Sequence, residues 1–231
     1  MSTKRIYLTR RNPAIAAQDF PREWRRHAAL AASFSNVGRR YTRVAQCTKA
    51  EDFALAPAND YAGVALLWME SLESALEVNT DPEIVARLRP DEVRVFGMEV
   101  VHCAMFTEER ILRDGPATGV VVIEFLARAP GMSPEDFADR WQAHAHQVLG
   151  HTSVQRLVRR YAQDLVVRQP PPGYEFDGVS EMWFETAEDA ATLLRDPRYV
   201  EEVAQAREGF CDVGRTVLMP TRVTHAWSAP A

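Results

Sequence analysis

The sequence predicts an α+β fold in which one β-α-β-β-α-β unit occurs twice, in residues 1–112 and 117–231. Three observations support it: repeated motifs, helical spacing of apolar residues after the first strand of each copy, and β-rich segments at matching distances. The paired motifs are Phe20-x-x-x-Trp24-x-x-His27 with Phe137-x-x-x-Trp141-x-x-His144, Gly63-Val64-x-x-x-Trp68 with Gly178-Val179-x-x-x-Trp183, and Asp81-Pro82 with Asp196-Pro197. Chance does not readily produce so many matches in one order.

Each copy is predicted to begin with a strand and then a helix. The strand covers residues 5–10 in the first copy and 119–127 in the second, where β-formers prevail. In the second copy Ser133 caps the helix, Pro134 takes its first position and Gly150 ends it. Its apolar stripe consists of Phe137, Trp141, His144 and Val148, and the first copy repeats the stripe with Phe20, Trp24, His27 and Leu30.

The rest of each unit is predicted as two strands, a second helix and a last strand. The second helix begins near Ser71 or Thr186, and Thr186 with Asp189 approximates a capping box. The expected strands are residues 38–44, 64–69 and 99–105 in the first copy, and 158–167, 179–184 and 216–222 in the second.

This order of elements is the ferredoxin-like arrangement. Both helices of a unit then lie on one face of a four-stranded sheet, so the other face needs cover. Two units in one chain supply that cover by packing sheet against sheet. We therefore expect an intramolecular α/β barrel of the dimeric type, with a ligand pocket in its lumen. Whether such fused pseudo-dimers form a further homodimer stays open.

Composition excludes several classes of function. The 231 residues are 46% hydrophobic and carry a formal net charge of −5, with acidic and basic residues interleaved. No run of Lys or Arg forms a basic stripe, so we expect no nucleic-acid partner. Lysine occurs only at Lys4 and Lys49, which argues against Schiff-base chemistry, and no phosphate-binding loop motif is present.

The sequence also predicts a cytoplasmic protein without a membrane or metal partner. Its apolar stretches are too short to cross a bilayer, and its first residues do not resemble a signal peptide. The three cysteines lack metal-ligand spacing and suit reduced thiols. His144 and His146, two residues apart on a helix, point in nearly opposite directions, so they do not form a metal site with His151.

Both copies resemble the EthD family of the dimeric α/β-barrel superfamily. The resemblance rests on the helix motif with its aromatic residue and His, on an Arg-Tyr strand, on the segment from Asp177 to Phe184, and on the later Asp-Pro. The sequence departs from the family pattern in two places. His27 and His144 follow their Trp by three residues instead of four. The Glu that the family has on its sheet is present in the second copy as Glu181, whereas the first copy has Leu66 at that position. The resemblance implies a small-molecule protein without a bound cofactor. Its relatives include cofactor-independent oxygenases, polyketide cyclases, and decarboxylases or dehydratases of phenolic compounds.

His27 and His144 are the first candidates for acid–base catalysis, because an imidazole titrates near neutral pH. Both lie on an apolar helix stripe, so each could instead be a buried structural His. His102 interrupts the apolar segment before the end of the first copy, and it is a further candidate for lining the pocket.

Glu124 and Glu181 stand among apolar residues of predicted strands. A carboxylate in such surroundings is costly unless it is paired or lines a wet cavity, and burial suits it to proton transfer. The alternative is an ion pair with one of the many Arg residues. Substrate contacts are expected from Tyr7, which matches Glu124 in the repeat, and from Tyr41, Tyr161, Trp68 and Trp183, although packing would equally explain these aromatic residues.

From these residues the sequence favours a cofactor-free lyase that acts on a hydrophobic aromatic compound. In this hypothesis His and Glu transfer protons in the barrel, and decarboxylation suits the set best because an apolar pocket disfavours a carboxylate. The first alternative is a cofactor-independent oxygenase of a phenolic substrate. The second is a non-catalytic small-molecule-binding accessory protein.

Overall fold

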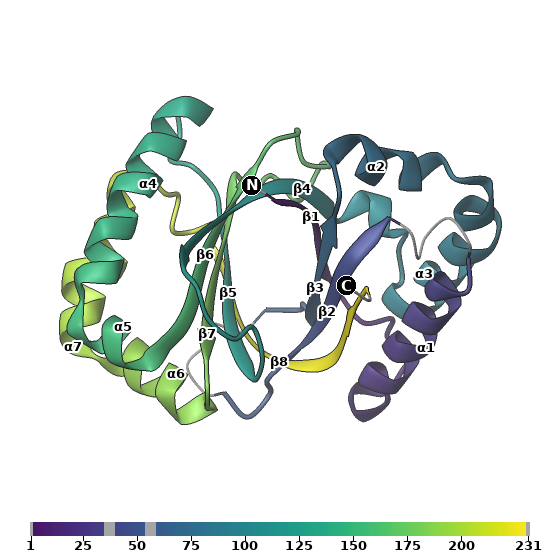
Figure 1. Ribbon diagram of the computed structural model, residues 1–231, viewed down its shortest axis with the longest axis horizontal. Coiled ribbons are helices and arrows are strands. Elements are labelled where there is room, and N and C mark those ends of the chain that lie inside the picture. Colours follow the sequence, from purple (N-terminus) through teal and green to yellow (C-terminus); the bar gives the residue numbers. More distant parts are fainter. Residues whose placement is uncertain (1, 35–39, 54–58, 230–231) are drawn as a thin grey trace.

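Eight strands close into an antiparallel barrel, as the sequence predicts (Figure 1). The computed structural model describes residues 2–34, 40–53 and 59–229. The strands follow one another around the barrel in the order β1-β3-β2-β8-β5-β7-β6-β4. Their bounds are β1 Ser2–Thr9, β2 Tyr41–Lys49, β3 Gly63–Met69, β4 Ala104–Arg113, β5 Val120–Leu126, β6 Val158–Val166, β7 Gly178–Phe184 and β8 Val217–Ser228. The start expected for β2, at residues 38 and 39, lies outside the described residues.

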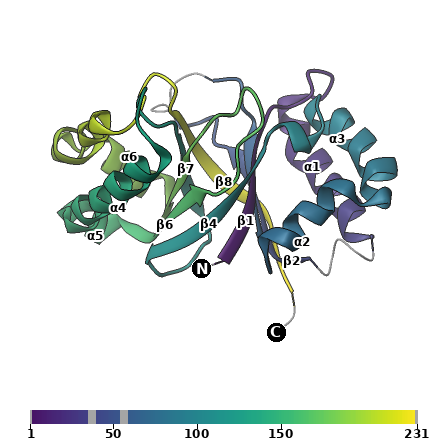
Figure 2. The same ribbon diagram turned by 90° about the horizontal axis from the view of Figure 1, so that it is seen from above.

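Helices cover the barrel on two opposite sides, one side for each half of the chain (Figures 1 and 2). The first half contributes α1 Phe20–Ala32, α2 Leu72–Glu77 and α3 Arg89–Phe96, with the π-helical turn η3 Ile84–Leu88 before α3. The second half contributes α4 Pro134–Gly150, α5 Thr152–Leu157, α6 Ala187–Arg195 and α7 Pro197–Tyr199, with the π-helical turn η5 Val200–Ala204. The predicted caps form: the side chains of Ser71, Ser133 and Thr186 each accept a backbone N–H of the helix that follows.

The repeated motifs have a common packing reason. A Cβ atom on Gly63 would overlap the ring of Trp24, and one on Gly178 would overlap the ring of Trp141. Each Gly therefore lets the Trp of the first helix lie directly on the sheet of its half. The two halves pack alike because this close approach needs a residue without a side chain.

The last strand of each half joins the other half. Strand β4 pairs with β1 and with β6, while β8 pairs with β5 and with β2. These two seams close the barrel.

The prediction that residues 99–105 form a strand is wrong at its start, because residues 100–102 form a 3₁₀ turn that places His102 in solvent. Two backbone hydrogen bonds close this turn, and the Glu92 carboxylate fixes its first N–H at 2.8 Å.

The lumen of the barrel holds a buried ion cluster centred on Lys4. Its Nζ lies 2.8 Å from Glu109 Oε1, 3.0 Å from Asp164 Oδ1 and 2.7 Å from Glu181 Oε1. Burial opposes the charged ammonium group, but the three carboxylates outweigh it and raise the pKa of Lys4. Burial also disfavours charge on Glu109, yet Lys4 and its other partners lower the pKa of Glu109 to about 2.

Apolar and aromatic side chains fill the lumen around this cluster. The indole N–H of Trp68 donates to Glu109 at 3.1 Å, and that of Trp183 donates to Glu181 at 3.0 Å. Other residues of this core are Ile6, Leu8, Val64, Leu66, Val121, Ile123, Phe125, Val179 and Met219. The predicted pocket in the lumen is therefore wrong: an interior of this size is filled by the inward-pointing residues of its own eight strands.

Replacing Lys4 with Met is expected to lower the free energy of unfolding by about 3–5 kcal/mol, because three carboxylates lose their shared cation in a buried site. The difference in the free energy of unfolding between wild type and Lys4→Met should shrink as the pH falls from about 7 to 5. In the variant, the carboxylates that lack Lys4 take up protons in the folded state. Urea unfolding measures both effects. Lys49→Met, at the only other lysine, is the matched control; an equal loss in both variants would contradict a special role for Lys4.

Candidate functional site

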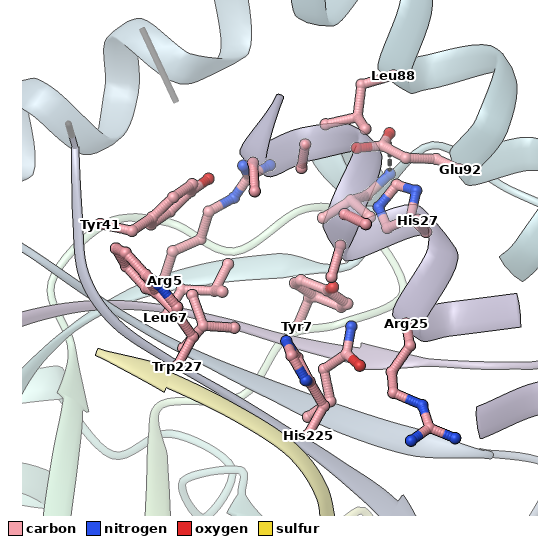
Figure 3. Close-up of a pocket in the computed structure, with 17 residues that line it drawn as sticks. Arg5, Tyr7, Arg25, His27, Tyr41, Leu67, Leu88, Glu92, His225 and Trp227 are labelled. Carbon is pink, nitrogen blue, oxygen red and sulfur yellow. Dashed lines mark hydrogen bonds between the residues drawn. The ribbon is translucent and has the colours of Figure 1, made fainter. Parts of the chain in front are cut away.

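A cavity of about 390 Å³ lies in the first half, between the helices and the outer face of the sheet (Figure 3). One wall comes from β1, β2 and β3, and the other from α1 and α3, while the end of β8 borders one side. Its volume falls in the range of about 300–1,000 Å³ that is usual for small-molecule sites. The cavity thus lies on the outer face of the sheet, whereas the sequence predicted a pocket on its inner face, in the lumen.

Small and apolar side chains make room for this cavity. Four of the residues that α1 contributes are alanines, whose methyl groups leave space that larger side chains would fill. The apolar lining consists of Ala28, Ala29, Ala31, Ala32, Val44, Leu67, Leu88, Val100 and Trp227. Such walls suit a ligand with a flat hydrophobic body.

His27 of α1 lines the cavity and is held by a carboxylate of α3. Its Nδ1 lies 2.9 Å from Asp91 Oδ2, and its ring meets the edge of Phe96 at a centroid distance of 5.2 Å. The bond from His27 is the main reason that the pKa of Asp91 falls to about 2, with Arg94 Nε at 2.6 Å as a further partner. With Nδ1–H donating to this carboxylate, Nε2 is the nitrogen left to accept a proton.

Tyr7 lies beside His27 in the same cavity and stays in its neutral form. Its hydroxyl oxygen accepts the indole N–H of Trp24 at 3.2 Å, and burial raises the pKa of Tyr7. The amide nitrogen of Gln46 donates to the backbone oxygen of Trp24 at 3.1 Å, whereas its Oε1 is buried without a hydrogen-bond partner among the described residues. The cavity therefore offers a phenolic hydroxyl and a free amide oxygen to a ligand.

Two buried charged residues of the cavity were missed by the sequence analysis. Arg5 of β1 is 5% exposed, and its Nη2 donates to Asn79 Oδ1 at 3.0 Å. Glu92 of α3 is also 5% exposed and accepts the N–H of Val100 at 2.8 Å. The strand pattern held a signal for Arg5, because Arg5 and Tyr7 alternate with the apolar Ile6 and so share a face.

The mouth of the cavity is built by both halves of the chain. His225 and Trp227 of β8 lie opposite Gln46 and Val44 of β2 in the register of the sheet. Burial is the first cause that lowers the pKa of His225, and the positive charge of Arg25 on α1 is the second. Figure 3 shows His225 and Arg25 at one side of the cavity, away from Arg5.

In the second half, side chains occupy the place that corresponds to the cavity of the first half. His144 of α4 lies 2.9 Å from the backbone oxygen of Val203, and burial lowers its pKa. Glu124, which matches Tyr7, forms an ion pair with Arg207, which matches Glu92 when counted from the Asp-Pro pair of each copy. The core of this half packs Val120, Val122, Tyr161, Met182, Phe184, Tyr199 and Val203 together. His144 is thus held by a backbone oxygen and does not line the cavity of the first half.

The residues predicted for the site separate into four groups. His27, Tyr7 and Tyr41 line the cavity. Glu181, Trp68 and Trp183 lie in the lumen, where the ion cluster holds them. Glu124 of β5, His144 of α4 and Tyr161 of β6 lie between the sheet and the helices of the second half. His102 lies on the exposed turn. Repeat position could not separate these groups, because the two helix imidazoles have the same sequence environment and different partners.

The described part of the chain contains neither a cluster of metal-ligating side chains nor a membrane-spanning helix. Within residues 2–34, 40–53 and 59–229, no group of three or more His, Cys, Asp or Glu side chains is placed to hold a metal ion. No helix in those residues combines the length and the apolar character that crossing a membrane requires.

The sequence and the fold each match known proteins. The family model for the EthD domain matches residues 12–97 and again residues 129–214. No protein with a curated description has a detectably similar sequence. Both family matches lie within the predicted halves of the chain.

Solved structures share this fold at low sequence identity. A candidate monooxygenase of Fusobacterium nucleatum is 6% identical, with a TM-score of 0.62 over 100% of this chain and 95% of that one. An anthrone oxidase-like protein is 9% identical, with a TM-score of 0.66 and coverage of 100% and 93%. A chlorite dismutase mutant of Candidatus Nitrospira defluvii is 10% identical, with a TM-score of 0.51 and coverage of 96% and 92%. These likenesses establish the barrel fold.

Asp91→Asn is expected to reduce the loss of folding stability that occurs as the pH falls into the acid range. The folded protein holds the pKa of Asp91 near 2, below its ordinary 3.8, so the unfolded chain takes up this proton first. Wild-type protein therefore loses stability as the pH falls through this interval, and the Asn variant, which cannot titrate, loses less. Thermal unfolding across the interval measures the slope. Asp139→Asn, an exposed change on α4, should keep the wild-type slope; the same slope in Asp91→Asn would contradict the assignment.

Proposed function

The chain belongs to the EthD domain family, and from this membership and the cavity geometry we propose that it is an enzyme that oxidises a phenolic aromatic compound with molecular oxygen. One observation carries the proposal. An imidazole held by a carboxylate, His27 with Asp91, lines an apolar cavity beside the neutral hydroxyl of Tyr7. We infer that each half is a ferredoxin-like repeat, which the strand orders β4-β1-β3-β2 and β8-β5-β7-β6 support.

Proton transfer from the substrate is the first step. His27 Nε2 accepts the proton of the phenolic hydroxyl, and Asp91 stabilises the imidazolium that forms. Tyr7 donates its hydroxyl hydrogen to the phenolate oxygen, because burial keeps that hydroxyl protonated. The alanines of α1 and the side chains of Leu67 and Leu88 keep water away from this anion.

The phenolate then supplies the electrons for the reaction with oxygen. A ring carbon that carries hydrogen, ortho or para to the phenolate oxygen, forms a bond to O₂, and the imidazolium of His27 returns its proton to the peroxide. The hydroperoxide loses water as the ring C–H proton leaves and the O–O bond breaks, which gives a quinone. One oxygen atom of O₂ is in the product and the other is in water. The substrate is the reductant, so the balance needs no further electron donor.

The names of two similar folds agree with this chemistry, namely the candidate monooxygenase and the anthrone oxidase-like protein. The lyase favoured by the sequence drew its proton donors from Glu124, Glu181 and His144 as well as from His27. Ion pairs hold both carboxylates outside the cavity, and a backbone oxygen holds His144. The geometry therefore favours oxidation over decarboxylation, and anaerobic turnover distinguishes the two.

His27→Ala is expected to lower the rate of oxygen consumption by about 10²–10⁴-fold, because the variant lacks the base that forms the phenolate. An oxygen electrode measures this rate with 1,5-dihydroxynaphthalene and 1-naphthol, and absorbance follows the quinone. His144→Ala is the matched control at the same repeat position, and it should keep the wild-type rate once thermal unfolding confirms that it is folded.

Three outcomes would contradict the proposal. Release of carbon dioxide from a carboxylated phenol such as 4-hydroxybenzoate, at the same rate with and without oxygen, would favour the lyase. Tight binding of aromatic compounds without any turnover would favour the accessory protein. Equal losses in folded His27→Ala and His144→Ala would remove the assignment of the base.

A further inference from the structure

Arg5 is a buried cation without a counter-charge among the described residues. In that part of the chain, the fully or nearly buried Lys and Arg side chains are Lys4, Arg5 and Arg160. Lys4 contacts three carboxylates, and Arg160 Nη2 lies 2.8 Å from Glu109 Oε1. Arg5, in contrast, forms no ion pair with the described residues; its Nη2 contacts the neutral Asn79, and its Nε is buried without a hydrogen-bond partner.

An uncompensated buried charge is costly, so a protein keeps one where a ligand supplies the opposite charge. Arg5 lines the cavity that contains His27, which places the missing anion on the ligand. The buried carboxylate of Glu92 also faces this cavity and does not pair with Arg5; it accepts the backbone N–H of Val100. The remaining charged side chain, Arg25, is exposed at the mouth.

We infer that Arg5 is an anion subsite and that the substrate is an aromatic compound with a carboxylate on the side of the ring opposite to its reacting hydroxyl. This inference rests on the proposed function for the position of the hydroxyl at His27. Figure 3 shows Arg5 beside Tyr41 and Leu67 on one side of the cavity and His27 with Glu92 on the other. A flat apolar body between these sides would lie along the alanines of α1.

The local contacts prepare Arg5 for a planar anion. The bond from Nη2 to Asn79 Oδ1 fixes one edge of the guanidinium, and the ring of Phe106 lies 6.0 Å from its centre. Nε is buried without a hydrogen-bond partner among the described residues, so no protein carboxylate compensates the guanidinium there. A guanidinium binds a carboxylate through two parallel hydrogen bonds. Arg25 cannot replace it, because an exposed guanidinium at the mouth is hydrated and gives little net binding energy.

Two matched pairs of probes test this subsite: 6-hydroxy-2-naphthoate with 2-naphthol, and 4-hydroxybenzoate with phenol. Titration calorimetry measures Kd for each. Wild-type protein should bind the acid of at least one pair about 10- to 100-fold more tightly than the neutral phenol. In Arg5→Met this preference should disappear while binding of the neutral phenol stays unchanged. Arg5→Lys should restore part of it, and Arg25→Met should leave it intact.

Stability without ligand gives a second readout. Arg5→Met should keep or raise the melting temperature of the free protein, because Met replaces an unpaired cation in an apolar site. A structural Arg5 would instead cause a loss of stability, which would overturn the inference. Equal Kd values for acid and phenol in wild-type protein, or an undiminished preference in Arg5→Met, would also overturn it while leaving the oxidation proposal standing. If none of the four probes binds, the inference and the proposed function both fail.

Discussion

The ion cluster around Lys4 is the constraint on which the rest of the molecule depends. Lys4 extends from β1 into the lumen and meets carboxylates of β4, β6 and β7, so one ammonium group joins strands of both halves. The cost of burying these charges is offset only when all partners are in place, which ties closure of the barrel to correct pairing at the β4–β6 seam. Side chains occupy the lumen in this way, and the cavity described above lies on the outer face of the sheet.

Duplication provides two candidate places, one between sheet and helices in each half, and the chain uses them differently. Where the first half has Arg5, Tyr7 and Glu92, the second has Val122, Glu124 and Arg207 at matching positions. The second set packs or pairs internally, whereas in the first set Arg5 keeps a buried Nε without a partner among the described residues. The second half therefore contributes packing stability, while the first accepts unpaired groups that a ligand can satisfy.

The sequence was sufficient to predict the barrel because the repeat, the caps and the strand alternation are local patterns. It was insufficient for the site, because the deciding contacts join distant residues. Lys4 and Glu181 lie 177 positions apart, and only closure of the barrel brings them together. The two helix imidazoles, His27 and His144, follow identical motifs, and their difference comes from Asp91 on a later helix. A lone Arg at position 5 also has no local sign that its counter-charge is missing.

The halves cannot be separated in function, even though the proposed chemistry lies in one of them. Strand β8 belongs to the second half, yet its end pairs with β2 and brings His225 and Trp227 to the mouth of the first cavity. Without the second half, β2 would have a free edge there, and the apolar walls would face water. In the proposed chemistry, exclusion of water strengthens the action of the His27 imidazole and of the Arg5 guanidinium on a bound anion. The second half thus completes the wall of the cavity in the first half.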